Sequence, residues 1–238
     1  MICFLTSSPI IPGTYDLNPA NGLIDELKKH FPAACRALFI CADPDSPERT
    51  DRFAADMRYC MEQAGFAFRE YRILDGRNRG DAEALIRASD LLILAGGHVP
   101  TQNRFFAEIG LRGLLKGYDG IVIGVSAGSM NCADTVYAQP EMEGEAADPS
   151  YRRFLTGLNL TKTMILPHYQ MVKDDMVDGL RVFEDITYPD SVGKRFYALS
   201  DGSYLYIRPG REELRGEAYL ISGGILTPFS AENEVTVL

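Results

Sequence analysis

The sequence predicts an α/β fold with a flavodoxin-like, doubly wound and mostly parallel sheet, because three features occur together. Apolar runs of strand length alternate with segments of helical periodicity through the first half of the chain. Turn residues separate most of these segments. Several runs are apolar throughout, which is typical of strands buried on both faces of a parallel sheet. We therefore expect the ligand site beyond the carboxyl ends of the strands.

In the first half, strands are expected at 2–6, 37–41, 66–74, 91–95 and 120–125. Helices are expected between them, after Asn18-Pro19, after Ser46-Pro47, around Leu85 and from Thr101 to Gly117. The run Gly120–Val125 is the most strand-like of all, and both of its faces should be buried. Each strand and helix pair then forms one unit of the parallel sheet.

The second half is less regular. Residues 139–150 are polar, acidic and interrupted by prolines, so we expect a long loop over the edge of the sheet. A strand at 163–166 ends in Pro167-His168, and a helix carrying Met176, Leu180 and Phe183 is expected after it. Further strands are expected at 196–199, 204–207, 218–221 and 234–238, and the last three of them resemble antiparallel strands near the C-terminus.

Length and composition restrict the class of protein. A chain of 238 residues can bury one large core, so residues 1–238 are expected to form a single domain. The net charge of −9 argues against a nucleic-acid partner or an anionic membrane. We find no signal peptide and no apolar span, which predicts a cytoplasmic protein. The 5 cysteines form no CxxC pair and are expected to be reduced and buried, with no disulfide framework and no metal site.

The strongest local signal is Gly124-Val125-Ser126-Ala127-Gly128, a G-x-S-x-G sequence between a buried strand and residues that can begin a helix. A serine on such a sharp turn is held in a strained conformation with its hydroxyl exposed. Glycines flank it because a Cβ there would strike the neighbouring strand or helix. An ordinary βα turn is the alternative explanation. The pattern favours Ser126 as a nucleophile, with the N–H of Ala127 aimed at an oxyanion.

A serine nucleophile needs a base, and the chain has only 3 histidines. His30 follows two lysines at a helix end, where a solvated cation is the simpler interpretation. His98 follows Gly96-Gly97 and could line the site. We favour His168, because the end of its strand directs the ring toward the rim that carries Ser126.

The third residue should be a carboxylate that fixes the imidazole tautomer. Asp201 is favoured because it follows the strand at 196–199 at the same edge, although a turn aspartate in Ser-Asp-Gly is an equally open explanation. Asp134 and Glu141 lie after the nucleophile and are simpler to explain as loop charges. Gly97 is the candidate for the second oxyanion donor, because strands that end at Gly97 and Ser126 should be neighbours.

These segments together resemble peptidase family S51, which contains aspartyl dipeptidase (peptidase E) and, more distantly, cyanophycinase. The resemblance runs from Ile2 to about Ile207 and rests on the motifs around Gly97, Ser126, His168 and Asp201. It implies a fold like that of class I glutamine amidotransferases, and hydrolysis of short peptides through an acyl-enzyme with no metal or other cofactor. It also implies Ser126 as nucleophile, His168 as base, and the N–H groups of Gly97 and Ala127 as oxyanion donors.

The sequence departs from the family pattern at the acid position and after Gly97, and it is longer at 139–157 and at the C-terminus. Asp201 stands where peptidase E has a glutamate, so either the strand lies closer or another carboxylate such as Glu141 serves. Gly97-His98-Val99-Pro100-Thr101 replaces the usual Gly-Gly-Asn-Thr. In the dipeptidase an arginine after the catalytic histidine binds the substrate aspartate. Arg181 lies in the comparable region, and Arg181, Lys173, His98 and Glu141 are the candidate substrate-binding residues.

Two other functions remain open on the sequence. An esterase of the α/β-hydrolase class would use Ser126, Glu141 and His168 in that chain order. A binding protein could keep the same scaffold without catalysis. The expected partner is a short peptide, with no nucleic acid or membrane, and the expected assembly is a monomer or homodimer. A preference for N-terminal aspartate would require a cation in the pocket.

Overall fold

The computed structural model describes residues 1–238 and contains a central sheet of eight strands. Its strand order is β16-β13-β12-β1-β5-β4-β2-β3. The bounds are β1 (Ile2–Thr6), β2 (Cys35–Ile40), β3 (Phe68–Leu74), β4 (Leu91–Leu94), β5 (Ile121–Val125), β12 (Tyr204–Arg208), β13 (Arg211–Arg215) and β16 (Val235–Val237). The strands from β1 to β3 in this order are parallel, and the three C-terminal strands continue the sheet in antiparallel pairs.

The mixed α/β fold with a mostly parallel sheet is as predicted, but the flavodoxin-like strand order is wrong. In that order the first strand lies between the second and the third. Here β1 pairs with β5 on one side and with the antiparallel β12 on the other. The position of β1 follows from long-range pairing, which no local pattern in the sequence reports. As a result, the ends of β1, β5 and β4 lie side by side.

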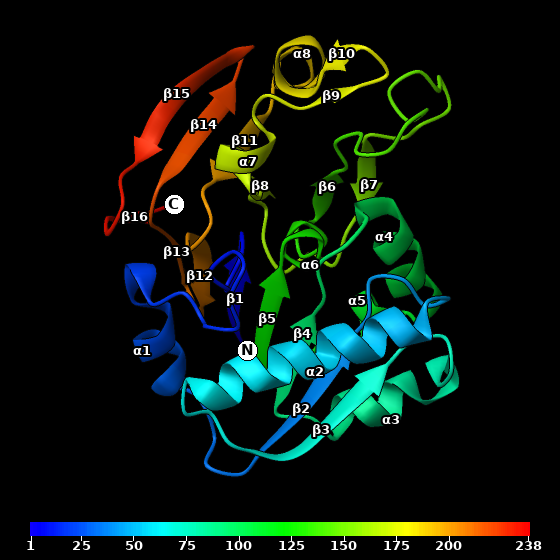
Figure 1. Cartoon of the computed structure of the whole chain (residues 1–238), viewed down its shortest axis with the longest axis vertical. Helices are drawn as coiled ribbons and strands as arrows, with labels where there is room; N and C mark the ends of the chain where they lie inside the picture. The colour runs from blue at the N-terminus through cyan, green and yellow to red at the C-terminus, as the bar shows by residue number, and fades with distance from the viewer.

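Helices cover both faces of the central sheet (Figure 1). On one face, α1 (Leu23–Lys28) and α2 (Pro47–Gln63) pack against side chains such as Phe4 and Phe39. On the other, α3 (Ala82–Arg87), α4 (Val99–Glu108) and α5 (Leu111–Leu114) pack against Leu38 and Leu92. Strand residues alternate between these two cores, as the pleat requires. Short 3₁₀ turns, η1 (Ala20–Gly22) and η2 (Arg79–Asp81), precede α1 and α3. None of the helices combines the length and the apolar character needed to cross a membrane.

A second sheet lies above the central one in Figure 1. It has the order β15-β14-β11-β8, with β8 (Met164–Leu166), β11 (Arg195–Leu199), β14 (Ala218–Ser222) and β15 (Ile225–Ser230). The pair β8 and β11 is parallel, so both strands end at the same edge. The short helix α6 (Ala127–Met130) follows β5, and the hairpin of β6 (Thr135–Tyr137) with β7 (Phe154–Thr156) precedes β8.

Two helix predictions need correction. The helix expected from Thr101 to Gly117 is divided into α4 and α5 at Gly110, which has a φ of 65°. The prediction of a helix that carries Met176 and Leu180 is wrong. Those residues lie in a hairpin of β9 (Met176–Val177) and β10 (Leu180–Arg181), bounded by α7 (Tyr169–Val172) and followed by a π-helical segment, η3 (Val182–Thr187), and α8 (Tyr188–Asp190). Gly179, with a φ of 79°, supplies the turn that interrupts the helical pattern.

Candidate active site

Ser126 lies at a strained turn between β5 and α6. Its φ of 50° and ψ of −111° are rare for a residue with a side chain. The backbone N–H of Ser126 donates to the carbonyls of Thr6 (3.1 Å) and Ser7 (3.2 Å), so the end of β1 holds the turn in place. The side chain is partly exposed, as predicted for an elbow that presents its hydroxyl.

The two glycines of the motif are required by close backbone approach. A Cβ on Gly124 would lie 2.7 Å from Cα of Ser129, and one on Gly128 would lie 2.2 Å from the carbonyl oxygen of Leu94. Distances under about 3 Å are not tolerated between such atoms. The glycines therefore allow α6 to pack directly onto β5 and β4, which fixes the direction in which the turn points.

His168 and Asp201 form a close pair at the ends of β8 and β11. His168 Nδ1 lies 2.7 Å from Asp201 Oδ1, and the Asp201 side chain is only 7% exposed. Burial raises the pKa of Asp201, but the hydrogen bond and the charge of His168, with further bonds from Ser7 and Gln170, lower it below its ordinary value overall. The carboxylate is therefore held ionised, as is required to orient an imidazole.

Ser7, which the sequence analysis did not identify, connects these two residues. Its fully buried hydroxyl donates to Asp201 Oδ1 (2.8 Å) and accepts from the backbone N–H of His168 (2.7 Å). Ser7 follows β1, so its role depends on the position of β1 beside β5. The only signal for Ser7 in the sequence was its place directly after a predicted strand. Because Ser-Ser-Pro sequences are common in loops, that signal did not distinguish Ser7 from an ordinary loop residue.

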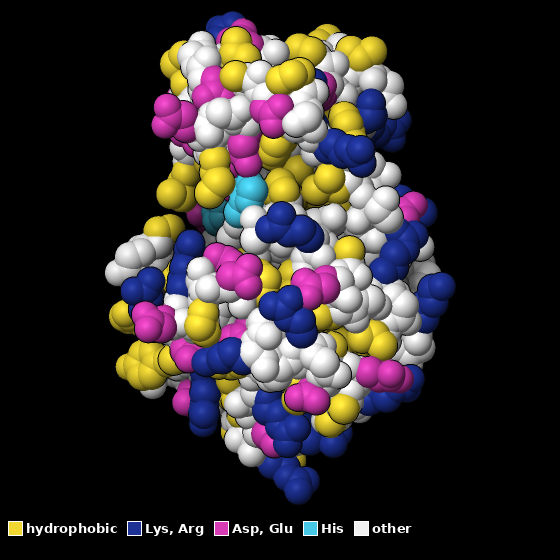
Figure 2. All heavy atoms as spheres, turned by 90° about the vertical axis from the view of Figure 1, so that its right-hand side faces the viewer, with side chains coloured by type: hydrophobic (Ala, Val, Ile, Leu, Met, Phe, Trp, Pro, Cys, Tyr) yellow, Lys and Arg dark blue, Asp and Glu magenta, His cyan; other side chains and the backbone are white.

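Ser126 and His168 line the same cavity of about 380 Å³, together with Gly96 and Gly97. No hydrogen bond joins the Ser126 hydroxyl to His168. In free enzymes such bonds are often long and tighten only when substrate is bound. The candidate site thus lies where the second sheet meets the central sheet, and in the view of Figure 2 histidine side chains reach the surface at that level.

Gly97 and Ala127 carry backbone N–H groups that donate to no backbone carbonyl outside helices and strands. Gly97 has a φ of 154°, and a Cβ there would lie 2.6 Å from the Ala42 side chain. Gly97 lies shortly after the end of β4, and Ala127 lies shortly after the end of the neighbouring strand β5. Gly97 lines the cavity, whereas Ala127 is completely buried behind Ser126.

The other sequence candidates lie farther away or have other partners. His98 lines an adjoining cavity of about 110 Å³, and its Nε2 pairs with Glu145 Oε1 at 2.8 Å. Glu141 is an exposed residue whose side chain makes no hydrogen bond, and desolvation of its carboxyl group, followed by the nearby Glu145 and opposed by His168, raises its pKa to about 7. Arg181 lies on β10, is exposed, and pairs with Asp185 at 2.6 Å. Arg181 and Lys173 do not line the cavity that contains Ser126.

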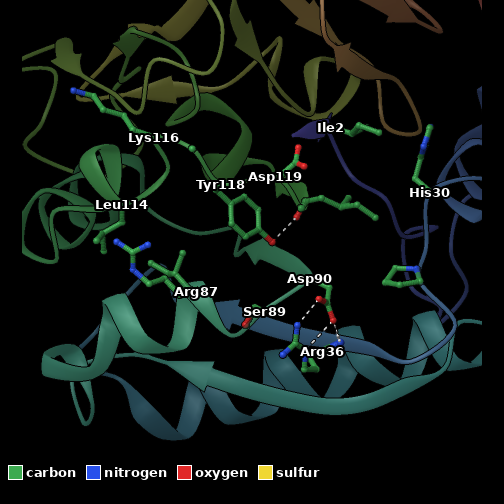
Figure 3. Close-up of a pocket in the computed structure, with 15 residues that line it drawn as sticks. Ile2, His30, Arg36, Arg87, Ser89, Asp90, Leu114, Lys116, Tyr118 and Asp119 are labelled. Carbon is green, nitrogen blue, oxygen red and sulfur yellow. Dashed lines mark hydrogen bonds and ion pairs between the residues drawn. The ribbon is translucent and has the colours of Figure 1, made fainter.

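A larger cavity of about 580 Å³ lies at the opposite, amino ends of the strands (Figure 3). Several of its charged residues already have partners, because Arg36 binds Asp90 at 2.7 Å and Asp119 binds the N-terminal amine at 3.0 Å. It contains no serine on a strained turn, and its one histidine, His30, contacts Tyr206 at 2.8 Å and Glu26 at 3.7 Å, with no nucleophile beside it. Nor does any group of three His, Cys, Asp or Glu side chains in the molecule lie where it could hold a metal ion. The candidate site is therefore chosen by the chemistry around Ser126 and not by cavity volume.

The chain is similar to known peptidases in sequence and fold. The model of peptidase family S51 matches residues 3–214. The crystal structure of a peptidase from an acI-B1 Actinobacterium is similar, with a TM-score of 0.66, 16% identity, and coverage of 100% of this chain and 96% of that chain. A candidate peptidase E from Listeria monocytogenes EGD-e has a TM-score of 0.61 and 19% identity, with coverage of 96% and 98%. At these identities the solved structures show the fold. A comparison with curated proteins found no match.

Proposed function

The chain belongs to peptidase family S51, and from that premise we propose that it is a serine peptidase that hydrolyses short peptides through an acyl-enzyme on Ser126. The observation that carries the proposal is the pairing of His168 with a buried, ionised Asp201 beside the cavity that Ser126 lines. A strained serine, an oriented imidazole and free backbone N–H groups are the parts that acyl transfer needs.

In the proposed reaction the Ser126 hydroxyl attacks the scissile carbonyl carbon while His168 Nε2 takes its proton. Asp201 holds the proton on Nδ1 and stabilises the imidazolium. The N–H groups of Gly97 and Ala127 donate to the oxyanion. When the C–N bond breaks, His168 returns its proton to the leaving amine. Water then attacks the ester carbonyl, its proton passes to His168, and breakage of the acyl bond restores the Ser126 hydroxyl as the acid product leaves.

Asp201 is the acid in this proposal, rather than Glu141. Asp201 contacts the imidazole directly, whereas no hydrogen bond connects the Glu141 side chain to His168. With Asp201 the chain order is Ser, His, Asp, which differs from the order of α/β-hydrolase esterases. Because β8 and β11 are paired neighbours, Asp201 after β11 reaches the imidazole of His168 after β8 directly, at 2.7 Å.

The substrate in this proposal is a short peptide. A cavity of about 380 Å³ is near the lower end of the range for small-molecule sites. A preference for N-terminal aspartate is not included, because Arg181 is engaged by Asp185 away from the cavity.

The proposal is tested with Ala-Leu, Asp-Leu and Asn-Leu as substrates and a p-nitrophenyl ester as the alternative. We expect peptide hydrolysis, and a loss of about 10³-fold or more in kcat for Ser126→Ala and His168→Ala, with unfolding temperatures near that of the wild type. Asp201→Asn should lower kcat by about 10⁴-fold through the wrong imidazole tautomer. Ser150→Ala, at an exposed loop serine, is the control.

Three results would contradict it. Full activity in Ser126→Ala would show that Ser126 is not the nucleophile. Ester hydrolysis without peptide hydrolysis favours an esterase. A larger loss for Glu141→Gln than for Asp201→Asn would assign the acid to Glu141.

A further inference from the structure

The helix α2 presents an unpaired cation and an unpaired anion to the cavity beside Ser126. Arg49 and Asp56 both line that cavity. Neither side chain forms an ion pair or a hydrogen bond with another residue, whereas Arg58 of the same helix and the nearby Arg77 are both paired with carboxylates. In Figure 1, α2 crosses in front of the central strands.

The spacing of the two charges is set by the helix. Residues seven apart lie on one face of an α-helix, with Cα atoms about 10 Å apart along the axis. Phe53 lies between them on the same face, and its ring lies 5.2 Å from the Arg49 guanidinium carbon. Arg49, Phe53 and Asp56 thus form a stripe of cation, aromatic ring and anion along the cavity wall.

The positive charge of Arg49 also lies at the end of α2 where the helix dipole is unfavourable to it. Arg49 is two residues after Pro47, in the first turn of α2, where a positive charge is disfavoured. It also lines the second cavity, which contains His98 and Met142, so the guanidinium lies between the two cavities. A cation that its helix disfavours and that has no carboxylate partner is available to an anionic ligand.

Resting on the proposed function, we propose that Arg49 and Asp56 bind the two termini of a short zwitterionic peptide. Arg49 binds the terminal carboxylate and Asp56 the terminal ammonium. An extended chain advances about 3.3–3.6 Å per residue, so two or three residues span the helical separation once side-chain reach is included. Phe39, Phe53 and Met57 line the wall with apolar surface for the peptide side chains. The clamp selects length, because a longer peptide cannot place both charges.

The test measures kcat/KM on Ala-Leu-Ala with free termini, with a C-terminal amide, and with an N-terminal acetyl group. For the wild type we expect each cap to lower kcat/KM by about 10- to 100-fold. Arg49→Gln should reduce the rate for the free peptide by a similar factor and leave the rate for the amide unchanged. Asp56→Asn should likewise reduce the rate for the free peptide and leave the rate for the acetylated peptide unchanged.

Matched controls come from the same helix. Arg52 contacts the same Phe53 ring, at 5.6 Å, but does not line the cavity, and Glu48 is exposed outside it. Arg52→Gln and Glu48→Gln should leave all three rates unchanged, and a loss equal to that of Arg49→Gln or Asp56→Asn would show that helix charge alone is responsible and would overturn the clamp.

The remaining outcomes separate the two proposals. Equal cleavage of free and capped peptides by the wild type overturns the clamp and leaves the peptidase proposal standing. If Arg49→Gln affects Asp-Leu but not Ala-Leu or Ala-Leu-Ala, the guanidinium binds a side chain, and its assignment to the terminal carboxylate is wrong. If the wild type cleaves no peptide at all, the proposed function fails and the clamp fails with it.

Discussion

At the residue scale, the candidate site depends on buried polar groups that each contact two partners. Ser7 is the central example, because its hydroxyl binds both the carboxylate of Asp201 and the backbone of His168. A buried hydroxyl that satisfies two groups fixes their relative positions more tightly than either contact alone. Ser7 is therefore a positioning residue rather than a catalytic one.

Ser7→Ala should lower both stability and turnover. The substitution leaves the backbone N–H of His168 without a partner and leaves Asp201 Oδ1 with His168 Nδ1 alone, which costs about 1–3 kcal/mol in the free energy of unfolding, measured with urea. We expect kcat to fall by about 10- to 100-fold with little change in KM, because the imidazole loses its alignment and substrate contacts remain.

Ser8→Ala is the control for this prediction. Ser8 is next in the chain, and its hydroxyl bonds only to the backbone of Ile10. An unchanged kcat in Ser7→Ala would show that the hydroxyl has no positioning role.

The carboxyl group of Glu141 makes the stability of the folded chain depend on pH. Its pKa is raised to about 7 by desolvation and by Glu145, so the folded chain holds this proton to higher pH than the unfolded chain. The contribution to stability is complete below the unfolded pKa and is lost as pH rises through about 7. Glu141→Gln, which stays neutral, should therefore raise the unfolding temperature by about 2 °C at about pH 8 and leave it unchanged at about pH 4.

Glu143→Gln is the matched control, because Glu143, like Glu141, is an exposed carboxylate of the same loop without a hydrogen-bond partner, and the substitution removes the same charge. An equal effect of Glu141→Gln at both pH values would contradict the titration.

At the element scale, the turn between β5 and α6 depends on how closely the helix packs onto the sheet. Gly124 and Gly128 remove the Cβ atoms that would otherwise meet Ser129 and Leu94. The same packing fixes the strained backbone of Ser126, because the turn is held by the end of β1 and by the start of α6. Strain at this residue is therefore maintained by neighbouring elements rather than by local sequence.

Gly128→Ala should destabilise the protein by about 1–3 kcal/mol, because the added methyl group lies 2.2 Å from the Leu94 carbonyl oxygen and must displace α6. The control is Gly113→Ala in α5, where no atom lies within 4 Å of the new Cβ. That change should stabilise by about 0.5–1 kcal/mol through helix propensity. Urea denaturation measures both, and a neutral Gly128→Ala would show that α6 can shift freely.

At the scale of the whole molecule, the site is assembled from two sheets and bordered by a loop. Ser126 comes from the central sheet, whereas His168 and Asp201 follow two strands of the second sheet. The loop at 139–150 is tied to the start of α4 by the His98–Glu145 pair and to the β9–β10 turn by Asp178, which accepts the N–H groups of Gly144, Ala146 and Ala147. Elements far apart in the chain are thus connected around one cavity.

His98→Ala should loosen this loop. Glu145 Oε1 loses its partner, although Oε2 keeps the N–H groups of Glu141 and Met142. We expect limited digestion with a glutamyl endopeptidase to cut within 139–150 severalfold faster than in the wild type, because local opening becomes easier. His30→Ala, which removes a similar contact to Tyr206 elsewhere, should not change cleavage in this loop. Equal rates in both variants would show that the pair does not hold the loop.

The sequence by itself determined the parallel strands, the serine turn and the set of candidate side chains. Buried strands, flanking glycines and α2 with its Ser46-Pro47 start are encoded by local pattern, which is why β1, β5 and α2 match the predicted segments closely. The neighbouring ends at Gly97 and Ser126 also followed, because β4 and β5 are adjacent as expected.

Tertiary structure alone decided the rest. The place of β1 beside β5, and with it the contact of Ser7 with Asp201, depends on pairing across nearly the whole chain. The hairpin at Met176–Arg181 replaced a helix because Gly179 and strand pairing outweighed apolar spacing. Arg181 was selected from its position after the histidine and Arg49 was not identified, because only packing shows which guanidinium meets the cavity. Periodicity reports which face of an element is buried, whereas partners distant in sequence are set by the free energy of the complete fold.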